Sequence, residues 1–224
     1  MKIIIYATHS FGTYDTLSKH PDIIVLGFGT KWKGFIEKAR VIRDYLHTLP
    51  DDEIVVIIDG FDSIIKNTEN VESLFKSMNC NVLVSQDNQL GGIPIFISKY
   101  IKQKTFGTCK DDKTIANSGL CMGYVKYLKI IFKYLIEGES TDDQRNFNSA
   151  CSSFPFLKVD TENIIFENCQ DDNQVDVSNA HFCQTPGKIS FTRVKRALQE
   201  YPQFFILEII LICLILYGVY IWRR

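Results

Sequence analysis

Short apolar runs alternate along the chain with segments whose apolar residues recur every three or four positions. The runs predict strands and the longer periods predict helices. The expected strands are Lys2–Thr8, Ile23–Phe28, Ile54–Asp59, Val82–Ser85, Gly119–Tyr124 and Ile164–Phe166. The expected helices are Ile36–Leu49, Val71–Ser77, Val125–Ile136 and Asp142–Cys151. Strands that alternate with helices in this way are typical of an α/β layer fold.

The last apolar run, "FFILEIILICLILYGVYIW", is much longer than the others. It covers Phe204–Trp222 with a single charge, Glu208, and as a helix it spans about 28 Å, since each residue adds roughly 1.5 Å. Aromatic residues near its end resemble interfacial anchors. We therefore expect a domain over residues 1–190, a basic neck over 191–203 and a transmembrane helix over 204–222, and a buried core helix stays open as the alternative.

Charges around this run predict its orientation. Four basic residues precede it within about twenty positions and two follow it, so the excess of positive charge favours a cytosolic domain. These residues are Lys188, Arg193, Lys195 and Arg196 before the run, and Arg223 and Arg224 after it. The first apolar run, Ile3–Ala7, is too short for a secretory signal and agrees with this placement. The lumenal side of a membrane is the alternative.

Composition narrows the class of protein. The 224 residues allow one sizeable domain, and 25 basic against 26 acidic residues leave no excess of positive charge for nucleic acid. The seven cysteines are scattered, form no CxxC pair and leave at least one unpaired. We expect a reducing compartment rather than a framework of disulfides.

The stretch "IVVIIDGFDSII" carries the first candidate chemistry. Its apolar strand ends at Asp59, where ligands bind in α/β proteins, and Gly60 lets the chain turn closely before Asp62. Two carboxylates across a tight turn can share one Mg²⁺ or Mn²⁺ and, through it, a diphosphate. An Asp-Gly turn followed by a capping Asp is the structural alternative.

Further segments follow in a characteristic order. The sequence contains "ATHSFGTYDTL", "LGFGTKWKG", "KARVIRDYL", "VVIIDGFDSII", "LVSQD", "ANSGLCMGY" and "TDDQ". In this order the chain resembles, over residues 2–190, the glycosyltransferase domain of the procollagen lysyl hydroxylase and collagen galactosyltransferase-like group. The resemblance implies a nucleotide-sugar fold of the GT-A type, with a mixed, mostly parallel sheet and flanking helices, beside the C-terminal transmembrane helix.

The resemblance also implies a role for each candidate residue. Asp59, Asp62 and His181 would bind Mn²⁺ or Mg²⁺ together with the diphosphate of a UDP-sugar. Phe61 would pack on the uracil or ribose, Trp32 would close over the nucleotide and Thr8 would contact its base. The residues expected around the transferred sugar and the acceptor hydroxyl are Asp87, Asn117, Asp142 and Asp143.

Simpler interpretations of the same residues stay open. Trp32 is also compatible with an ordinary, partly buried aromatic, and Asn117 with an Asx turn before Gly119. Thr141 and Gln144 form a capping-box pattern that explains "TDDQ" without catalysis.

The segment around His181 departs from the family pattern. Where the family has a turn like His-Gly-Asn-Gly, this chain has "HFCQTPG", so Phe182 replaces the flexible glycine. Without the resemblance, a lone histidine in a polar stretch reads as a surface residue.

Two classes of function follow. The first is a membrane-anchored, metal-dependent glycosyltransferase that moves a hexose from a UDP-sugar to an acceptor hydroxyl of a protein or glycan. The second is a non-catalytic domain that binds a nucleotide sugar or a protein partner at a membrane. Acidic residues stand at every expected metal and sugar position, which favours the enzyme.

Overall fold

The computed structural model describes residues 1–87, 103–104, 106–109, 114–169 and 172–185, together with seven isolated positions between 206 and 221. The chain divides into two units, Met1–Pro186 and Gly187–Arg224. Within the described residues, no helix has both the length and the apolar character needed to cross a bilayer. The whole of the expected neck, 191–203, and most of the segment 204–222 lie outside the described residues.

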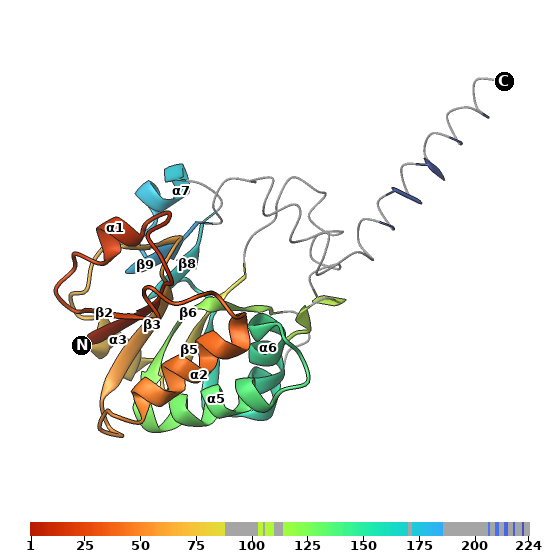
Figure 1. The fold of residues 1–224 in the computed structure, drawn as a ribbon. Coiled ribbons are helices and arrows are strands. Elements are labelled where there is room, and N and C mark those ends of the chain that lie inside the picture. The colour runs from red at the N-terminus through yellow and green to blue at the C-terminus, as the bar shows by residue number, and fades with distance from the viewer. Residues whose placement is uncertain are drawn as a thin grey trace. The chain divides into compact units, whose positions relative to one another are not determined.

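The first unit is built around a six-stranded mixed sheet (Figure 1). Its strand order is β2-β1-β3-β6-β5-β7. β1 is parallel to both β2 and β3, and β5 is parallel to β7, whereas β6 runs antiparallel to both of its neighbours. The strands are β1 (Lys2–Tyr6), β2 (Ile23–Leu26), β3 (Ile54–Asp59), β5 (Val82–Gln86), β6 (Ala116–Tyr124) and β7 (Leu157–Asp160).

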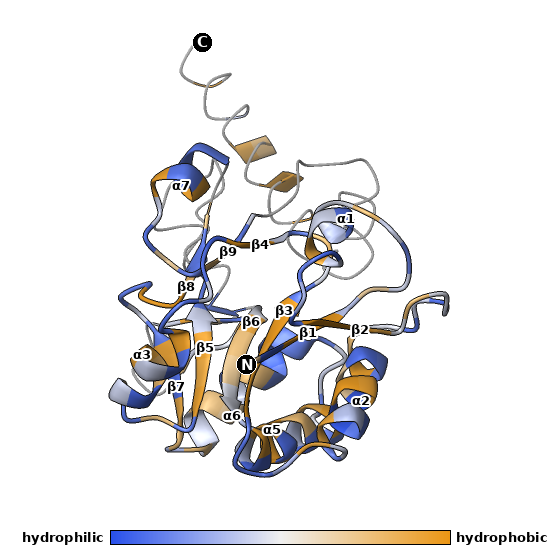
Figure 2. Cartoon of the chain, turned by 90° about the vertical axis from the view of Figure 1, so that its left-hand side faces the viewer, coloured by the Kyte–Doolittle hydropathy of each residue, from blue (hydrophilic) through white to orange (hydrophobic). Residues whose placement is uncertain are grey.

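Helices cover one face of this sheet. Apolar side chains from alternate positions of β1, β3 and β5 pack there against α2, α5 and α6. These helices are α2 (Phe35–Leu46), α5 (Val125–Glu137) and α6 (Asp143–Ser153). Figure 2 shows the apolar strands inside and the polar outer faces of the helices. Because β3 is apolar on both sides, it also contributes to a second core on the opposite face.

The opposite face is covered by short helices and a second sheet. This sheet has three strands in the order β4-β9-β8, and two of its phenylalanines, Phe166 and Phe182, belong to the second core. Its strands are β4 (Ser63–Ile65), β8 (Phe166–Asn168) and β9 (Phe182–Gln184). The short helices of this face are α1 (Tyr14–Leu17) and α3 (Val71–Ser77), whereas α7 (Asp172–Val177) packs through Val175 against Cys183 and Ile64 of the second sheet. The second sheet therefore joins the end of the domain to the turn that follows β3.

All ten expected elements have a counterpart; β3 and α3 have the predicted ends, and the other eight differ at one or both ends. The sequence interpretation missed β4, β7 and β9, which have three or four residues each, and the short helices α1 and α7. Strands this short show too few alternations for the pattern to register.

Asp160 supports the connection from β7 to the second sheet. Its buried carboxylate accepts hydrogen bonds from the backbone N–H groups of Ile164, Ile165 and Phe166, at 3.0, 2.7 and 2.9 Å. We expect Asp160→Asn to lower the free energy of unfolding by about 2 kcal/mol, since an NH₂ group then faces N–H donors. Chemical denaturation measures this loss, with the exposed Asp52→Asn as a control that should change little. Equal stability of the two variants would contradict it.

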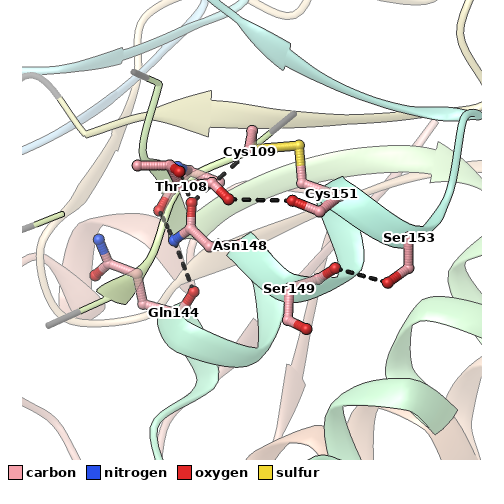
Figure 3. Close-up of a disulfide and its surroundings, with 9 residues drawn as sticks. Thr108, Cys109, Gln144, Asn148, Ser149, Cys151 and Ser153 are labelled. Carbon is pink, nitrogen blue, oxygen red and sulfur yellow. Dashed lines mark hydrogen bonds between the residues drawn. A yellow bond between two sulfur atoms is a disulfide. The ribbon is translucent and has the colours of Figure 1, made fainter. Parts of the chain in front are cut away.

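A disulfide joins Cys109 to Cys151 of α6 (Figure 3). Beside it the buried Asn148 side chain pairs with both backbone groups of Ala116, at 2.8 and 3.2 Å. The expectation of free thiols is therefore wrong at these two positions, because their separation of 42 residues gives no local spacing signal. The other five cysteines are free.

Candidate active site

Polar residues from several elements meet at the carboxyl edge of the central sheet. β3 ends there at Asp59, β5 ends at Gln86, and the antiparallel β6 begins there at Ala116. Residues 118–120 of β6 have no partner on β5, because the pairing moves from Val84↔Cys121 to Ser85↔Asn117. Such bulges redirect side chains, often next to active sites.

Asp59 and Asp62 converge on one side chain. Gln184, the last residue of β9, donates from Nε2 to Asp59 Oδ2 and to Asp62 Oδ1, each at 3.0 Å. The two carboxylate oxygens therefore surround a single point. Gly60 makes this turn possible, since a Cβ there would come within 2.9 Å of the backbone oxygen of Tyr6.

Gln184 belongs to a polar row across the second sheet. It pairs in register with Ser63 of β4 and with Asn168 of β8. All three side chains are buried, and Ser63 Oγ, Asn168 Oδ1 and Gln184 Oε1 have no hydrogen-bond partner in the structure. Unpartnered buried acceptors are uncommon in folded proteins and indicate that a further group completes the site.

Lys38 enters the same edge from α2. Its ammonium group forms an ion pair with Asp59 Oδ1 and lies 3.9 Å from Asp143 Oδ2. Burial lowers the pKa of Lys38, but the two carboxylates outweigh this effect and hold the pKa above its ordinary value. The lysine is therefore charged and links the pair at β3 to the start of α6.

Asp142 and Asp143 have different environments although they are adjacent. Asp142 is the N-cap of α6, and its Oδ1 accepts from the backbone N–H of Arg145 at 3.1 Å. Asp143 is buried and faces Lys38. Burial raises the pKa of Asp143 to about 6, and the Lys38 ammonium opposes that shift. The helix is capped by Asp142, so the expected capping box on Thr141 is wrong.

Asp87 and Asn117 lie at the same edge and take part in local hydrogen bonds. Asp87 Oδ2 accepts from Gln144 Nε2 at 3.0 Å, which ties the end of β5 to α6. Asn117 Oδ1 accepts from the backbone N–H of Gly119 at 2.7 Å. That bond is the Asx turn foreseen as the structural alternative for Asn117.

Aromatic rings gather around the turn after β3. Phe61 lies 5.2 Å from the His9 ring and 6.0 Å from Phe11, which is largely exposed. Gly12 allows this packing, because a Cβ there would overlap the backbone oxygen of Phe61. Thr8 is buried and its Oγ1 lies 3.0 Å from His9 Nδ1.

Trp32 stands in the glycine-rich loop between β2 and α2. Its ring contacts Tyr6 at 5.9 Å and Phe35 at 5.4 Å, both edge to face, and 40% of the residue is exposed. Tyr6 pairs in register with Asp59, so the Tyr6 ring lies between Trp32 and the strand that ends at Asp59. This position of Trp32 is compatible with both interpretations: an ordinary, partly buried aromatic and a residue that closes over a nucleotide.

His181 is not brought to the Asp59 and Asp62 pair. Its Nδ1 lies 3.1 Å from the backbone oxygen of Asn67, ahead of β9. Among the described residues, no three His, Cys, Asp or Glu side chains form a metal-binding group. The structure therefore does not bring His181 into the expected triad, and the side chain of β9 that contacts both carboxylates is Gln184.

We expect His181→Ala to leave the divalent-metal requirement of sugar transfer unchanged, because this ring contacts a backbone oxygen remote from the carboxylate pair. The measurement is the Mn²⁺ concentration that gives half-maximal UDP release. Asp62→Asn is the matched positive control. A several-fold increase in the Mn²⁺ requirement of His181→Ala would contradict this expectation.

Sequence reasoning missed Lys38 and Gln184. Lys38 stands in an amphipathic helical pattern, where a lysine reads as solvated, and the only signal was its place in the segment "KARVIRDYL". Gln184 closes a strand too short to recognise. Its side-chain chemistry is less distinctive than that of the nearby histidine.

Comparison with known proteins identifies the family. A family model described as the PLOD GT domain matches residues 7–184. No curated protein matches the chain. Among solved structures, a glycosyltransferase involved in the glycosylation of the major capsid of PBCV-1 has 13% identity and a TM-score of 0.49, over 88% of this chain and 97% of that one. The galactosyltransferase LgtC, solved with donor and acceptor sugar analogs, has 13% identity and a TM-score of 0.45, over 84% and 88%.

Because both scores are below 0.5, membership follows from the family model. The match covers most of the chain and includes the strands, turn and helix start that form the carboxylate edge. The chain belongs to the family of PLOD glycosyltransferase domains, and it is a glycosyltransferase.

Proposed function

We propose that this glycosyltransferase moves a hexose from a UDP-sugar to an acceptor hydroxyl with the help of a divalent cation, Mn²⁺ or Mg²⁺. The observation that carries the proposal is the convergence of Asp59 and Asp62 on a single nitrogen, 3.0 Å from each. A hydrogen-bond donor between two carboxylates marks a place that also suits a cation.

The residues present fit such a cation. Two carboxylates and the unpartnered amide oxygen of Gln184 provide hard oxygen donors, which Mg²⁺ and Mn²⁺ prefer. Asp59 and Asp62 would hold the cation. When bound, a divalent cation stabilises the negative charge of the departing diphosphate.

The protein's own charges organise the rest of the site. Lys38 supplies a buried positive charge beside Asp59, and it orients both this carboxylate and that of Asp143. Asp143 lies at the N-terminal turn of α6, where it faces Lys38. In this function Asp143 positions the acceptor hydroxyl or accepts its proton, and Asp87 and Asn117 line the sugar side.

The aromatic residues favour a nucleotide as the donor's recognition group. Phe61 lies between the two carboxylates in sequence and packs against His9, which supports a ring contact with a nucleotide held at the carboxylates. We assign Phe61 and Trp32 to the uridine and Thr8 to its base. Aromatic stacking contributes about 0.5–1.5 kcal/mol per ring pair, so these residues add to donor affinity without taking part in the chemistry.

The test is donor hydrolysis by the full chain. A panel of UDP-sugars is incubated with Mn²⁺, with Mg²⁺ or with EDTA, and released UDP is measured. We expect release from one or a few UDP-hexoses that EDTA abolishes. Equal UDP-sugar affinity with and without EDTA, or release from none of the panel, would overturn the proposal.

We further propose that residues 204–222 attach the enzyme to a bilayer. The support is the apolar sequence alone. The Cys109–Cys151 disulfide favours an oxidising compartment, and so the lumenal alternative over the cytosolic placement that the basic residues predict. Protease digestion of intact microsomes separates the two placements, since only a lumenal domain is protected.

A further inference from the structure

We propose that Gln184 is the third protein ligand of the cation at Asp59 and Asp62, through its side-chain oxygen Oε1. This inference rests on the proposed function, because it requires a cation at the carboxylate pair. It assigns to a glutamine the position expected for His181.

The hydrogen bonding of Gln184 is one-sided. A carboxamide has two donor hydrogens and one acceptor oxygen. In this structure the nitrogen donates to both carboxylates, whereas Oε1 is buried without a partner. The residue is 6% exposed, so water does not readily solvate this oxygen. An unpartnered buried acceptor of this kind costs about 1–3 kcal/mol.

Rotation about the terminal side-chain bond changes what Gln184 offers. It exchanges nitrogen and oxygen, and such sp³–sp² torsions are broad and roughly two-fold. With the nitrogen toward the carboxylates, the amide holds Asp59 and Asp62 together without a cation. With the oxygen toward them, the same side chain completes a set of three oxygen ligands.

Gly119 independently keeps room for this amide. A Cβ on Gly119 would lie 2.3 Å from Gln184 Oε1 and 2.4 Å from Nε2. Gly119 is not among the glycines with positive φ, so its backbone does not require glycine. A side chain at position 119 would therefore meet the Gln184 amide and displace it.

The donor set has a consequence for metal choice. Two carboxylates and an amide oxygen suit Mn²⁺ and Mg²⁺, whereas imidazole would extend the site towards Zn²⁺ and Co²⁺. We therefore expect the wild-type protein to prefer Mn²⁺ and Mg²⁺, and Gln184→His to gain affinity for Zn²⁺.

The test is Mn²⁺ binding to the full chain without any sugar donor. The electron paramagnetic resonance signal of free Mn²⁺ gives the dissociation constant, and circular dichroism checks the fold. We expect Gln184→Leu to weaken binding roughly tenfold, as for loss of a group that supports a metal site. Gly119→Ala should weaken it similarly by displacing the amide. His181→Ala is the control and should bind as the wild type does.

Gln184→His provides a direct readout. A coordinated imidazole adds nitrogen hyperfine coupling to the pulsed spectrum of bound Mn²⁺, and we expect this coupling in Gln184→His but not in the wild type. It decides the question even where Gln184→Leu does not fold. Absence of the coupling overturns the inference, and so does an unchanged Mn²⁺ affinity in folded Gln184→Leu.

The same titration separates this inference from the proposed function. If Asp59→Asn abolishes Mn²⁺ binding while every Gln184 variant binds normally, the cation site stands and Gln184 only positions the carboxylates. If the wild-type protein binds no Mn²⁺ or Mg²⁺, the metal-dependent function fails and this inference fails with it.

Discussion

Asp143→Asn is expected to fold normally and to lose sugar transfer by about 10²- to 10⁴-fold, the contribution typical of a positioned general base. Its carboxylate is buried beside the Lys38 ammonium, on the site side of α6. Asparagine preserves the size of the side chain but neither its charge nor its basicity. The turnover number for UDP release in the presence of acceptor measures the loss, and UDP-sugar affinity should change much less.

The neighbouring residue supplies the matched control. Asp142 caps α6 through the backbone N–H of Arg145, so Asp142→Ala should lower the free energy of unfolding by about 0.5–2 kcal/mol and keep most of the turnover. Thr141→Ala should change neither, since Thr141 is not the cap. A fully active Asp143→Asn, or an inactive but stable Asp142→Ala, would reverse these roles.

The pattern of apolar residues was sufficient for the central sheet and its helices. β3 is an unbroken apolar run because both of its faces are covered, and its end at Asp59 marks the ligand-binding edge directly. β9 could not be predicted in the same way. Its three residues show no alternation, and its place depends on pairing with β4 and β8 from distant parts of the chain.

The residues of the candidate site likewise fall into those that local sequence signals predict and those that only tertiary contacts reveal. Asp59, Asp62 and Asp143 follow from local signals, namely a strand end, a tight turn and a helix start. Lys38 and Gln184 belong to the site only through tertiary contacts, which bring α2 and β9 to the end of β3. A histidine near the expected position was the more familiar ligand, but three residues along a strand correspond to roughly 10 Å, enough to exchange one candidate for another.

The cysteines illustrate how composition alone can mislead. An odd number without CxxC pairs favoured free thiols, yet Cys109 and Cys151 meet because Asn148 of α6 holds the start of β6 beside them. The remaining buried cysteines, such as Cys121 of β6 near Lys38, behave as small apolar residues. Burial raises the pKa of the Cys121 thiol to about 12.

Asp59→Asn is expected to abolish metal-dependent donor binding and also to destabilise the protein. The sequence alone gives no sign of the second effect. In the structure Asp59 is the ion-pair partner of Lys38, whose side chain is only 10% exposed. Removing Asp59 takes the nearer of two carboxylates from the buried Lys38 ammonium and leaves Asp143 at 3.9 Å. We expect a loss of about 3 kcal/mol, at the lower end of the usual range because Asp59 itself is 31% exposed.

A double variant separates the two effects. Lys38→Met removes the stranded ammonium, so Lys38→Met with Asp59→Asn should recover most of the lost stability without recovering UDP-sugar binding in Mn²⁺. Asp62→Asn serves as the comparison, since the carboxylate that pairs with Lys38 at β3 is Asp59: it should lose donor binding with a smaller change in stability. Denaturant titration gives the stabilities and calorimetry gives donor affinity. Stabilities that simply add across the cycle would show that Lys38 and Asp59 do not interact, and the charge linkage between α2 and the carboxylate edge would have to be abandoned.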